Sequence, residues 1–357
     1  MGSDIRMKNR LNILYVLERI FNHMLFKRTV LSLLSLFGLS LIIFTLARIM
    51  PGDPARMALG PRAPEELVQK YREMLHLDKP IYLQYYYWLT DFFQGKLGIS
   101  LTSFREVSVD IIEFLPATLE LMLYVAIIQI TGTLILGTLS GSKPGSILDG
   151  ALRVFSYVGI CVPPFVWGLI LQFIFSYILG FFPATERLSP SVQVPRITGF
   201  VTIDAMITGN LRGFVDGLWH LILPSLALAL GAMAQEARIL RSAMVENINK
   251  DYILTLLSHG IPNYRIYFRY ALKPSLVSTI PVVGLDIASL IANAFMVEVI
   301  FNWPGLSKFG ITAMLRKDLN GIVGVVLVAG LVYTITNVIV DIILTLLDPR
   351  LRYGGER

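Results

Sequence analysis

The sequence is short of charged residues and almost free of cysteine. Only 16% of its 357 residues are Asp, Glu, Lys or Arg, against about 25% in average soluble proteins. Hydrophobic residues make up 54% of the chain and the mean hydropathy is +0.64. The single cysteine, Cys161, cannot form an intrachain disulfide. These shortages exclude a disulfide scaffold and a disordered chain, and they indicate an integral membrane protein.

Residue patterns for catalysis and metal binding are also missing. The one Gly-Lys pair, Gly95-Lys96, is followed by Leu97, so the chain has no P-loop for ATP. The four histidines are scattered and show no metal-ligand spacing, so we expect no metal site. No nucleophile and base occur together, and we expect no enzyme activity on this chain. The net charge of +6 comes from basic residues beside apolar runs, which favours a membrane over nucleic acid as partner.

Six apolar segments are long enough to cross the hydrocarbon core of a bilayer, which needs about 20 residues. The third contains Pro163-Pro164, and a kink at such a site is tolerated in membrane helices. The sequence therefore predicts an all-α integral membrane protein with six transmembrane helices. The predicted spans are 30–49, 118–139, 154–182, 219–240, 276–300 and 321–347.

The loop charges predict the orientation. With the N-terminus inside, the four inner stretches hold 17 Lys and Arg against 8 Asp and Glu, whereas the outer stretches hold 13 of each kind. The positive-inside rule therefore places both termini in the cytoplasm of a multi-pass protein of the cell membrane. We expect a cytoplasmic N-terminal segment (1–29), an extracytoplasmic cap region (50–117) and a cytoplasmic C-terminal tail (348–357).

The cap region contains its own structural signals. Pro64 followed by Glu65 and Glu66 predicts the start of a short helix. Four tyrosines and a tryptophan then crowd together. They fit either an aromatic belt at the outer membrane interface or a stacking platform for sugars or aromatic peptides, and the sequence leaves both open. These residues are Tyr82, Tyr85, Tyr86, Tyr87 and Trp88.

Four acidic residues lie in or at the ends of the predicted spans: Glu120, Asp286, Glu298 and Asp341. Ionisable groups inside membranes mark pathways or relays by default. Glu120, Glu298 and Asp341 are close to span ends, where an acid can reach water or cap a neighbouring helix. Asp286 is about ten residues into its span, so it is the candidate for a polar translocation path, with a structural role as the alternative.

A helical hairpin is predicted within residues 241–275, on the cytoplasmic side. Asp251 to His259 is helical by composition, Gly260 suits the left-handed residue that ends a helix, and Pro262 suits the first turn of the next. The hairpin has an apolar tip and is followed by basic residues at four-residue spacing. It either lies on the membrane surface as an amphipathic hairpin or forms a socket for a soluble partner.

From about residue 28 to 353 the chain resembles the permease subunits of ATP-binding-cassette importers, in particular the B-type subunit of dipeptide and oligopeptide permeases. The resemblance rests on seven stretches in the right order. They are Arg48–Ala55, Leu77–Pro80 with Gln84-Tyr85, Leu97–Ser100, Leu115–Leu121, Asp251–Gly260, Phe301–Leu306 and Leu347–Tyr353. The chain departs from the family pattern in the apolar run Leu254–Leu257 and in having Ser278 where a proline is usual.

The resemblance implies a type I importer permease in which residues 118–347 form the transmembrane domain. It implies four kinds of partner besides the lipid membrane: a second permease subunit, two ATPase subunits that bind the ATP and Mg²⁺, an external solute-binding protein, and a peptide-sized substrate. No cofactor is implied on this chain itself. The hairpin would be the coupling helix that contacts the ATPase, through Tyr252, Leu256, Leu257, Gly260, Ile261, Tyr264 and Arg265.

Two other functions remain open at the level of sequence. Relatives of this family also transport oligosaccharides, and the substrate is set mostly by the binding protein. An ion-coupled secondary carrier is the alternative of a different class, but such carriers show inverted repeats and interrupted helices in corresponding halves. We find neither in this sequence.

Overall fold

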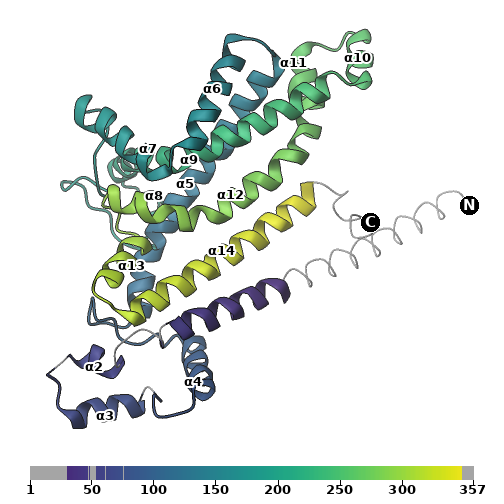
Figure 1. The fold of residues 1–357 in the computed structure, drawn as a ribbon. Helices are drawn as coiled ribbons and strands as arrows, with labels where there is room; N and C mark the ends of the chain where they lie inside the picture. The colour runs from purple at the N-terminus through teal and green to yellow at the C-terminus, as the bar shows by residue number, and fades with distance from the viewer. Residues whose placement is uncertain (1–29, 47, 49–53, 61, 75, 348–357) are drawn as a thin grey trace, which may run out of the picture.

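The computed structural model describes residues 30–347 apart from residues 47, 49–53, 61 and 75. The described part of the chain is almost entirely helical (Figure 1), and its extended pairing is limited to an isolated bridge between Ile99 and Glu106. The predicted N-terminal segment 1–29 and C-terminal tail 348–357 lie outside the described residues. The all-α prediction is confirmed.

Four helices of the described part are long and apolar enough to cross a membrane. They are α5 (Val107–Ser142), α9 (Leu211–Ile248), the continuous helix Asn263–Ile300 and α14 (Leu319–Leu347). The continuous helix consists of α11 (Asn263–Arg265), a π-helical segment (Ile266–Ala271) and α12 (Leu272–Ile300). The first predicted span corresponds to a shorter apolar helix, Val30–Leu46. The number of six spans therefore stays a prediction.

The third predicted span, 154–182, is not one kinked helix. The chain forms α6 (Ile147–Cys161), then α7 (Pro164–Leu171) with a π-helical segment (Gln172–Ile178). The helix axis bends by 110° between the two parts. Val162 and Pro163 both take extended backbone angles. A proline disfavours helical geometry in the residue before it and donates no hydrogen bond, so two successive prolines give two extended residues. Counted as one broken span, this pair would make five.

Two spans extend well beyond the predicted bounds. Helix α5 begins at Val107, eleven residues before the predicted start at 118, because Asp110 is buried there and paired with Arg105 and Ser103. Helix α9 continues past residue 240 to Ile248. Charged residues near a span end look like loop in the sequence, yet a helix can carry them where they find partners.

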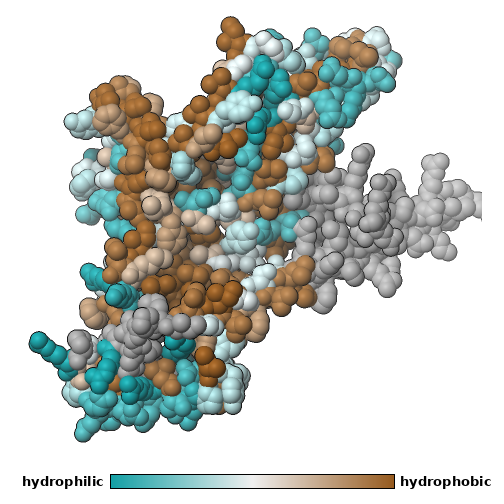
Figure 2. Space-filling model, in the orientation of Figure 1, coloured by the Kyte–Doolittle hydropathy of each residue, from teal (hydrophilic) through white to brown (hydrophobic). Residues whose placement is uncertain are grey.

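The core lies where α5, α9 and α12 pack together (Figure 1), and apolar residues dominate the outer surface around it (Figure 2). Small residues allow helix backbones to approach closely, as is common between membrane helices. On α5 three glycines, spaced four or five residues apart, each face one large side chain of α9. The pairs are Gly132 with Met233, Gly137 with Leu240, and Gly141 with Met244.

Short helices gather at the end of the molecule opposite to α10 (Asp251–Ser258), as Figure 1 shows. Tyr85, in α4, packs against Phe44 of the first apolar helix with ring centroids 5.2 Å apart, and its hydroxyl lies 2.7 Å from Oγ of Ser40. Tyr82 and Tyr86 of the same aromatic cluster are exposed. These short helices are α2 (Pro54–Leu59), α3 (Glu65–Met74), α4 (Ile81–Phe93), α8 (Val201–Ile207) and α13 (Leu306–Leu315).

Candidate functional site

The turn of the predicted hairpin is a Schellman motif. Gly260 takes φ of +73°, as predicted, and its amide donates to the Leu257 carbonyl at 3.0 Å. The next amide, of Ile261, donates to the Leu256 carbonyl at 3.2 Å. These are the two hydrogen bonds that define the motif. An apolar contact between the positions of Ile261 and Leu256 normally accompanies it. Pro262 then adopts extended geometry and starts the next helix.

A small apolar core lies beneath this turn. Ile253 and Ile266, one from each side of the hairpin, are buried against Leu240 and Met244 of α9. The predicted contact residues Leu256 and Ile261 are partly buried in the same core. They therefore support the turn from inside, and their predicted contact with a partner stays a prediction. Because the hairpin has its own core, it is held firmly against the ends of α9 and α12.

The outward face of the hairpin exposes apolar and aromatic side chains. Tyr252, Leu257 and Tyr264 are exposed, and their contact with an ATPase stays a prediction. The guanidinium of Arg265 bonds the Tyr264 hydroxyl at 3.0 Å and is itself exposed. Leu254 and Phe268, which are not among the predicted contact residues, are 61% and 56% exposed on the same hairpin. Figure 2 shows hydrophilic and hydrophobic residues side by side at this tip.

Polar contacts tie the root of the hairpin to the spans. Asn247 Nδ2, on α9, donates to Ser275 Oγ on α12 at 3.0 Å. Nearby, buried Asp149 at the start of α6 accepts two hydrogen bonds from Arg241 of α9, at 2.7 and 2.9 Å. A bidentate arginine–carboxylate pair is among the stronger and more directional polar contacts in proteins. The hairpin is therefore connected to a braced helix end.

Two of the intramembrane acids do what the structural alternative predicted. Glu298 accepts hydrogen bonds from Thr118 Oγ1 at 2.6 Å and from the Ser307 amide at 2.9 Å, in the first turn of α13. Glu120 accepts from the Thr202 amide at 2.8 Å, in the first turn of α8, and pairs with Arg187. Both acids thus cap a neighbouring helix, where the first amides have no intrahelical partner.

Asp286 has a different environment. Its carboxyl lies within hydrogen-bonding reach of Glu236 on α9, and its buried Oδ2 has no hydrogen-bond donor. Glu236 is fully buried and accepts from Gln129 Nε2 at 2.6 Å and from Thr133 Oγ1 at 2.7 Å. Glu236 is not among the predicted site residues, because the predicted span ends at residue 240 and Glu236 then lies close to the cytoplasmic loop.

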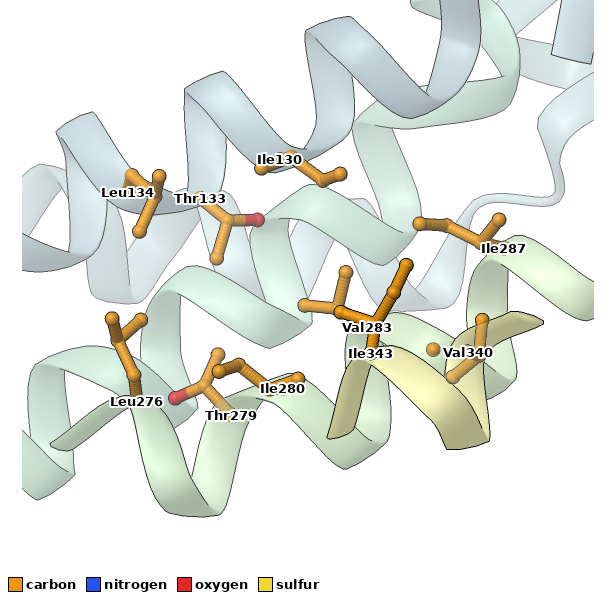
Figure 3. A pocket seen from close by; sticks show the side chains of 11 residues that line it. Ile130, Thr133, Leu134, Leu276, Thr279, Ile280, Val283, Ile287, Val340 and Ile343 are labelled. Carbon is orange, nitrogen blue, oxygen red and sulfur yellow. The ribbon is translucent and has the colours of Figure 1, made fainter. Parts of the chain in front are cut away.

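An apolar cavity of about 260 Å³ lies next to this cluster, between α5, α12 and α14 (Figure 3). Its only polar side chains are Thr133 and Thr279, and Thr133 is also the donor to Glu236. Within the described residues, no group of three His, Cys, Asp or Glu is placed to hold a metal ion.

Comparison with known proteins gives the family. A family model described as binding-protein-dependent transport system inner membrane component matches residues 133–353, and a model for the N-terminal part of such components matches residues 21–122.

Among similar curated proteins, the di/tripeptide transport system permease protein DppB of Pseudomonas aeruginosa is 38% identical, over 92% of this chain and 98% of that protein. The probable D,D-dipeptide transport system permease protein DdpB of Escherichia coli is 36% identical, over 89% and 94%. The oligopeptide transport system permease protein AppB of Bacillus subtilis is 32% identical, over 92% and 98%. With its long apolar helices, the chain is therefore a multi-pass membrane protein that belongs to the family of inner membrane components of binding-protein-dependent transport systems.

Proposed function

We propose that the chain is a permease subunit of an ATP-driven importer for peptides or peptide-sized solutes, and that it forms half of the translocation pathway. The relatives are permease proteins of D,D-dipeptide, di/tripeptide and oligopeptide transport systems, which supports peptides as the substrate class. No similar protein named here is an oligosaccharide permease or an ion-coupled carrier, so neither alternative gains support.

The proposed assembly has a second permease subunit, two ATPase subunits inside and a solute-binding protein outside. ATP and Mg²⁺ would be bound by the ATPases, and this chain would hold no cofactor. We further propose six spans, in which Val30–Leu46 and the broken pair α6–α7 each count as one, with both termini cytoplasmic. Residues 50–117 would then begin with the short helices of an outer cap on which the binding protein rests.

The observation that carries the proposal is the rigid hairpin between the two long spans α9 and α12. A transmission element must not absorb the motion that it passes on. The Schellman turn, its apolar core and the braced root satisfy that requirement. Its exposed apolar residues supply a surface that can be buried against an ATPase, chiefly Tyr252, Leu254, Leu257, Tyr264 and Phe268. Closure of the ATPases would then move α9 and α12 together.

Gly260→Val tests this role. A β-branched residue at positive φ strains the turn at a cost of about 1–3 kcal/mol, although no neighbouring atom lies within 4 Å of the added Cβ. We expect co-purification of the ATPase subunits and transport-coupled ATP hydrolysis to fall, while insertion of the chain into the membrane is unchanged.

Gly209→Val is the matched control. Gly209 has φ of +66° and equally open surroundings, but it lies in the loop before α9, at the end away from the hairpin. It carries the same backbone strain and should leave ATPase binding intact. Normal ATPase recovery and normal coupled hydrolysis in Gly260→Val would assign the hairpin to the lipid surface instead.

A further inference from the structure

The buried cluster of Glu236 and Asp286 joins three spans. Gln129 and Thr133 come from α5, Glu236 from α9 and Asp286 from α12. Glu236, Gln129 and Thr133 are at most 1% exposed, and Asp286 Oδ2 is buried. Among the described residues, no Lys, Arg or His forms an ion pair with either acid. Two carboxyl groups, one fully buried and one partly exposed, therefore meet without a compensating cation from the described residues.

The position of this pair follows from the register of α9 and α12. Asn247 bonds Ser275 at the root of the hairpin, and Glu236 meets Asp286 further into the spans. Eleven residues separate the two positions on α9 and eleven separate those on α12. Eleven residues are about three helical turns, so both contacts lie on one face of each helix. The antiparallel helices are thus joined by two side-chain contacts in one register, and the acid pair is the contact that lies further into the spans.

The cluster has more acceptors than donors. Its acceptors are four carboxylate oxygens and Gln129 Oε1, whereas its donors are the Gln129 amide group and the Thr133 hydroxyl. Both donors bond Glu236. Oδ2 of Asp286 and Oε1 of the fully buried Gln129 side chain have no donor at all. A buried acceptor without a donor is costly, and a single proton on the acid pair supplies one missing donor and removes the repulsion of two charges.

We propose that Glu236 and Asp286 together hold one proton, and that the resulting acid–carboxylate hydrogen bond clasps α9 to α12 within the spans, about three helical turns from the root of the hairpin. Glu236 is fully buried, and two carboxyl groups this close do not both ionise beside each other, so they share a proton. The clasp forms without any ligand other than the proton. When the proton leaves, two negative charges face each other and push the two helices apart.

The other charged groups around the pair are committed elsewhere. On α9, Arg241 is bound by Asp149 and Arg238 lies over the Tyr157 ring of α6. Helix α7 carries no titratable side chain, and α5 presents only its neutral amide and hydroxyl to the pair. On α14, Asp341 lines a separate cavity beside the first apolar helix. The pair therefore responds to pH through its own proton.

Infrared spectroscopy on the full chain in lipid bilayers tests the shared proton directly. A protonated carboxyl group has a carbonyl stretching band distinct from that of a carboxylate. We expect this band to be absent from the spectrum of Glu236→Gln. In the spectrum of Asp286→Asn it should be shifted or absent, because the proton on Glu236 then loses the carboxylate that accepts it. A band unaffected by both substitutions, or removed by one and unshifted by the other, would overturn the shared proton.

Thermal unfolding of the same reconstituted chain tests the clasp. The wild-type unfolding temperature should fall at alkaline pH as the proton is lost, whereas Asp286→Asn and Glu236→Gln should lack this fall, because an amide donates permanently to the remaining carboxylate. Glu246→Gln, which removes an exposed acid from the same helix, should keep the wild-type fall. The same alkaline fall in all four proteins would refute the clasp. Neither measurement needs an ATPase, so failure here is distinguishable from failure of the proposed function.

Discussion

At the scale of single residues, the buried carboxylates of this chain differ in what satisfies them. Glu120 and Glu298 accept hydrogen bonds from the first turns of neighbouring helices. Asp149 has an arginine. Asp204 accepts hydrogen bonds from the loop that precedes its helix. Only the pair of Glu236 with Asp286 depends on a neighbouring acid, among the residues that the structure describes.

Asp204 gives a prediction about acid sensitivity. Burial opposes its ionisation, but hydrogen bonds from Thr198 at 2.6 and 2.7 Å and from the amides of Ile197 and Gly199 outweigh it, and they hold the pKa of Asp204 below its usual value. A lowered pKa in the folded state stabilises the fold above the usual pKa of about 3.9, and this stabilisation is lost as pH falls below it.

We therefore expect Asp204→Asn to lower the free energy of unfolding by about 1–3 kcal/mol at neutral pH, because the amide cannot accept from all four donors. The deficit should shrink at acidic pH, where wild-type Asp204 is protonated as well. Denaturant titrations at neutral and acidic pH measure both values, and Asp251→Asn on the exposed hairpin is the control. A deficit that is equal at the two pH values would contradict the ionised loop anchor.

Some of these residues could be found from the sequence and others could not. Gly260 was predictable because glycine two residues before proline is a local signal for a helix end and restart. Glu236 was not, because its importance depends on a contact with Asp286, fifty positions away in the chain. The outward direction of Leu254 and Phe268 likewise depends on which face the small core of the hairpin uses.

At the scale of elements, the contact between α5 and α9 depends on glycines that leave room for large side chains. A Cβ added at Gly137 would lie 2.8 Å from Cβ of Leu240, an atom that cannot move without its backbone. Alanine favours a helix over glycine by about 1 kcal/mol, but overpacking costs about 1–3 kcal/mol. We therefore expect the cost of overpacking to exceed the gain in helix propensity at Gly137.

Gly137→Ala is therefore expected to lower the unfolding temperature. Gly150→Ala, in α6, places its Cβ in open space, so it gains helix propensity without a clash and should leave the unfolding temperature unchanged or slightly raised. Both variants can be compared by thermal unfolding in the same lipid. A Gly137→Ala protein as stable as Gly150→Ala would show that the two helices can separate slightly without cost.

The spans show how far sequence reasoning reaches for whole elements. Long apolar runs placed α5, α9, α12 and α14 correctly, because hydrocarbon thickness sets a minimum length. The same rule treated 154–182 as one span, since apolarity does not report direction and the two prolines determine the 110° bend. Helix ends at Val107 and Ile248 depended on polar contacts that span-length rules do not include.

At the scale of the whole molecule, the proposed orientation can be tested by cysteine labelling. The native Cys161 is exposed and must first be replaced by alanine. Single cysteines at exposed Ser191 and Ser258 should then behave oppositely. A membrane-impermeant reagent should label position 191 in intact cells, and position 258 only after permeabilisation. Labelling of position 258 in intact cells would overturn the orientation with cytoplasmic termini.

The family of the chain was accessible from sequence because seven separate motifs occur in one order, and the comparison with known proteins confirmed the family. The spatial relation between them was not accessible. Glu298, four residues before the Asn302-Trp303-Pro304 turn, bonds Thr118 in another motif 180 positions away. Such contacts join the ends of different spans, and only the folded arrangement shows them.

The two spans on either side of the hairpin have a mechanical consequence. Leu211–Ile248 and Asn263–Ile300 are both 38 residues long, which corresponds to roughly 57 Å each. The first leg ends in an extended residue, Lys250, before α10 begins, whereas the second runs from Asn263 without an intervening loop. In the proposed assembly, a push on the tip would bend the chain at Lys250 and would be transmitted along the continuous helix Asn263–Ile300. Helix α9 would then act as the pivot, and α12 would carry the displacement to the far side of the membrane.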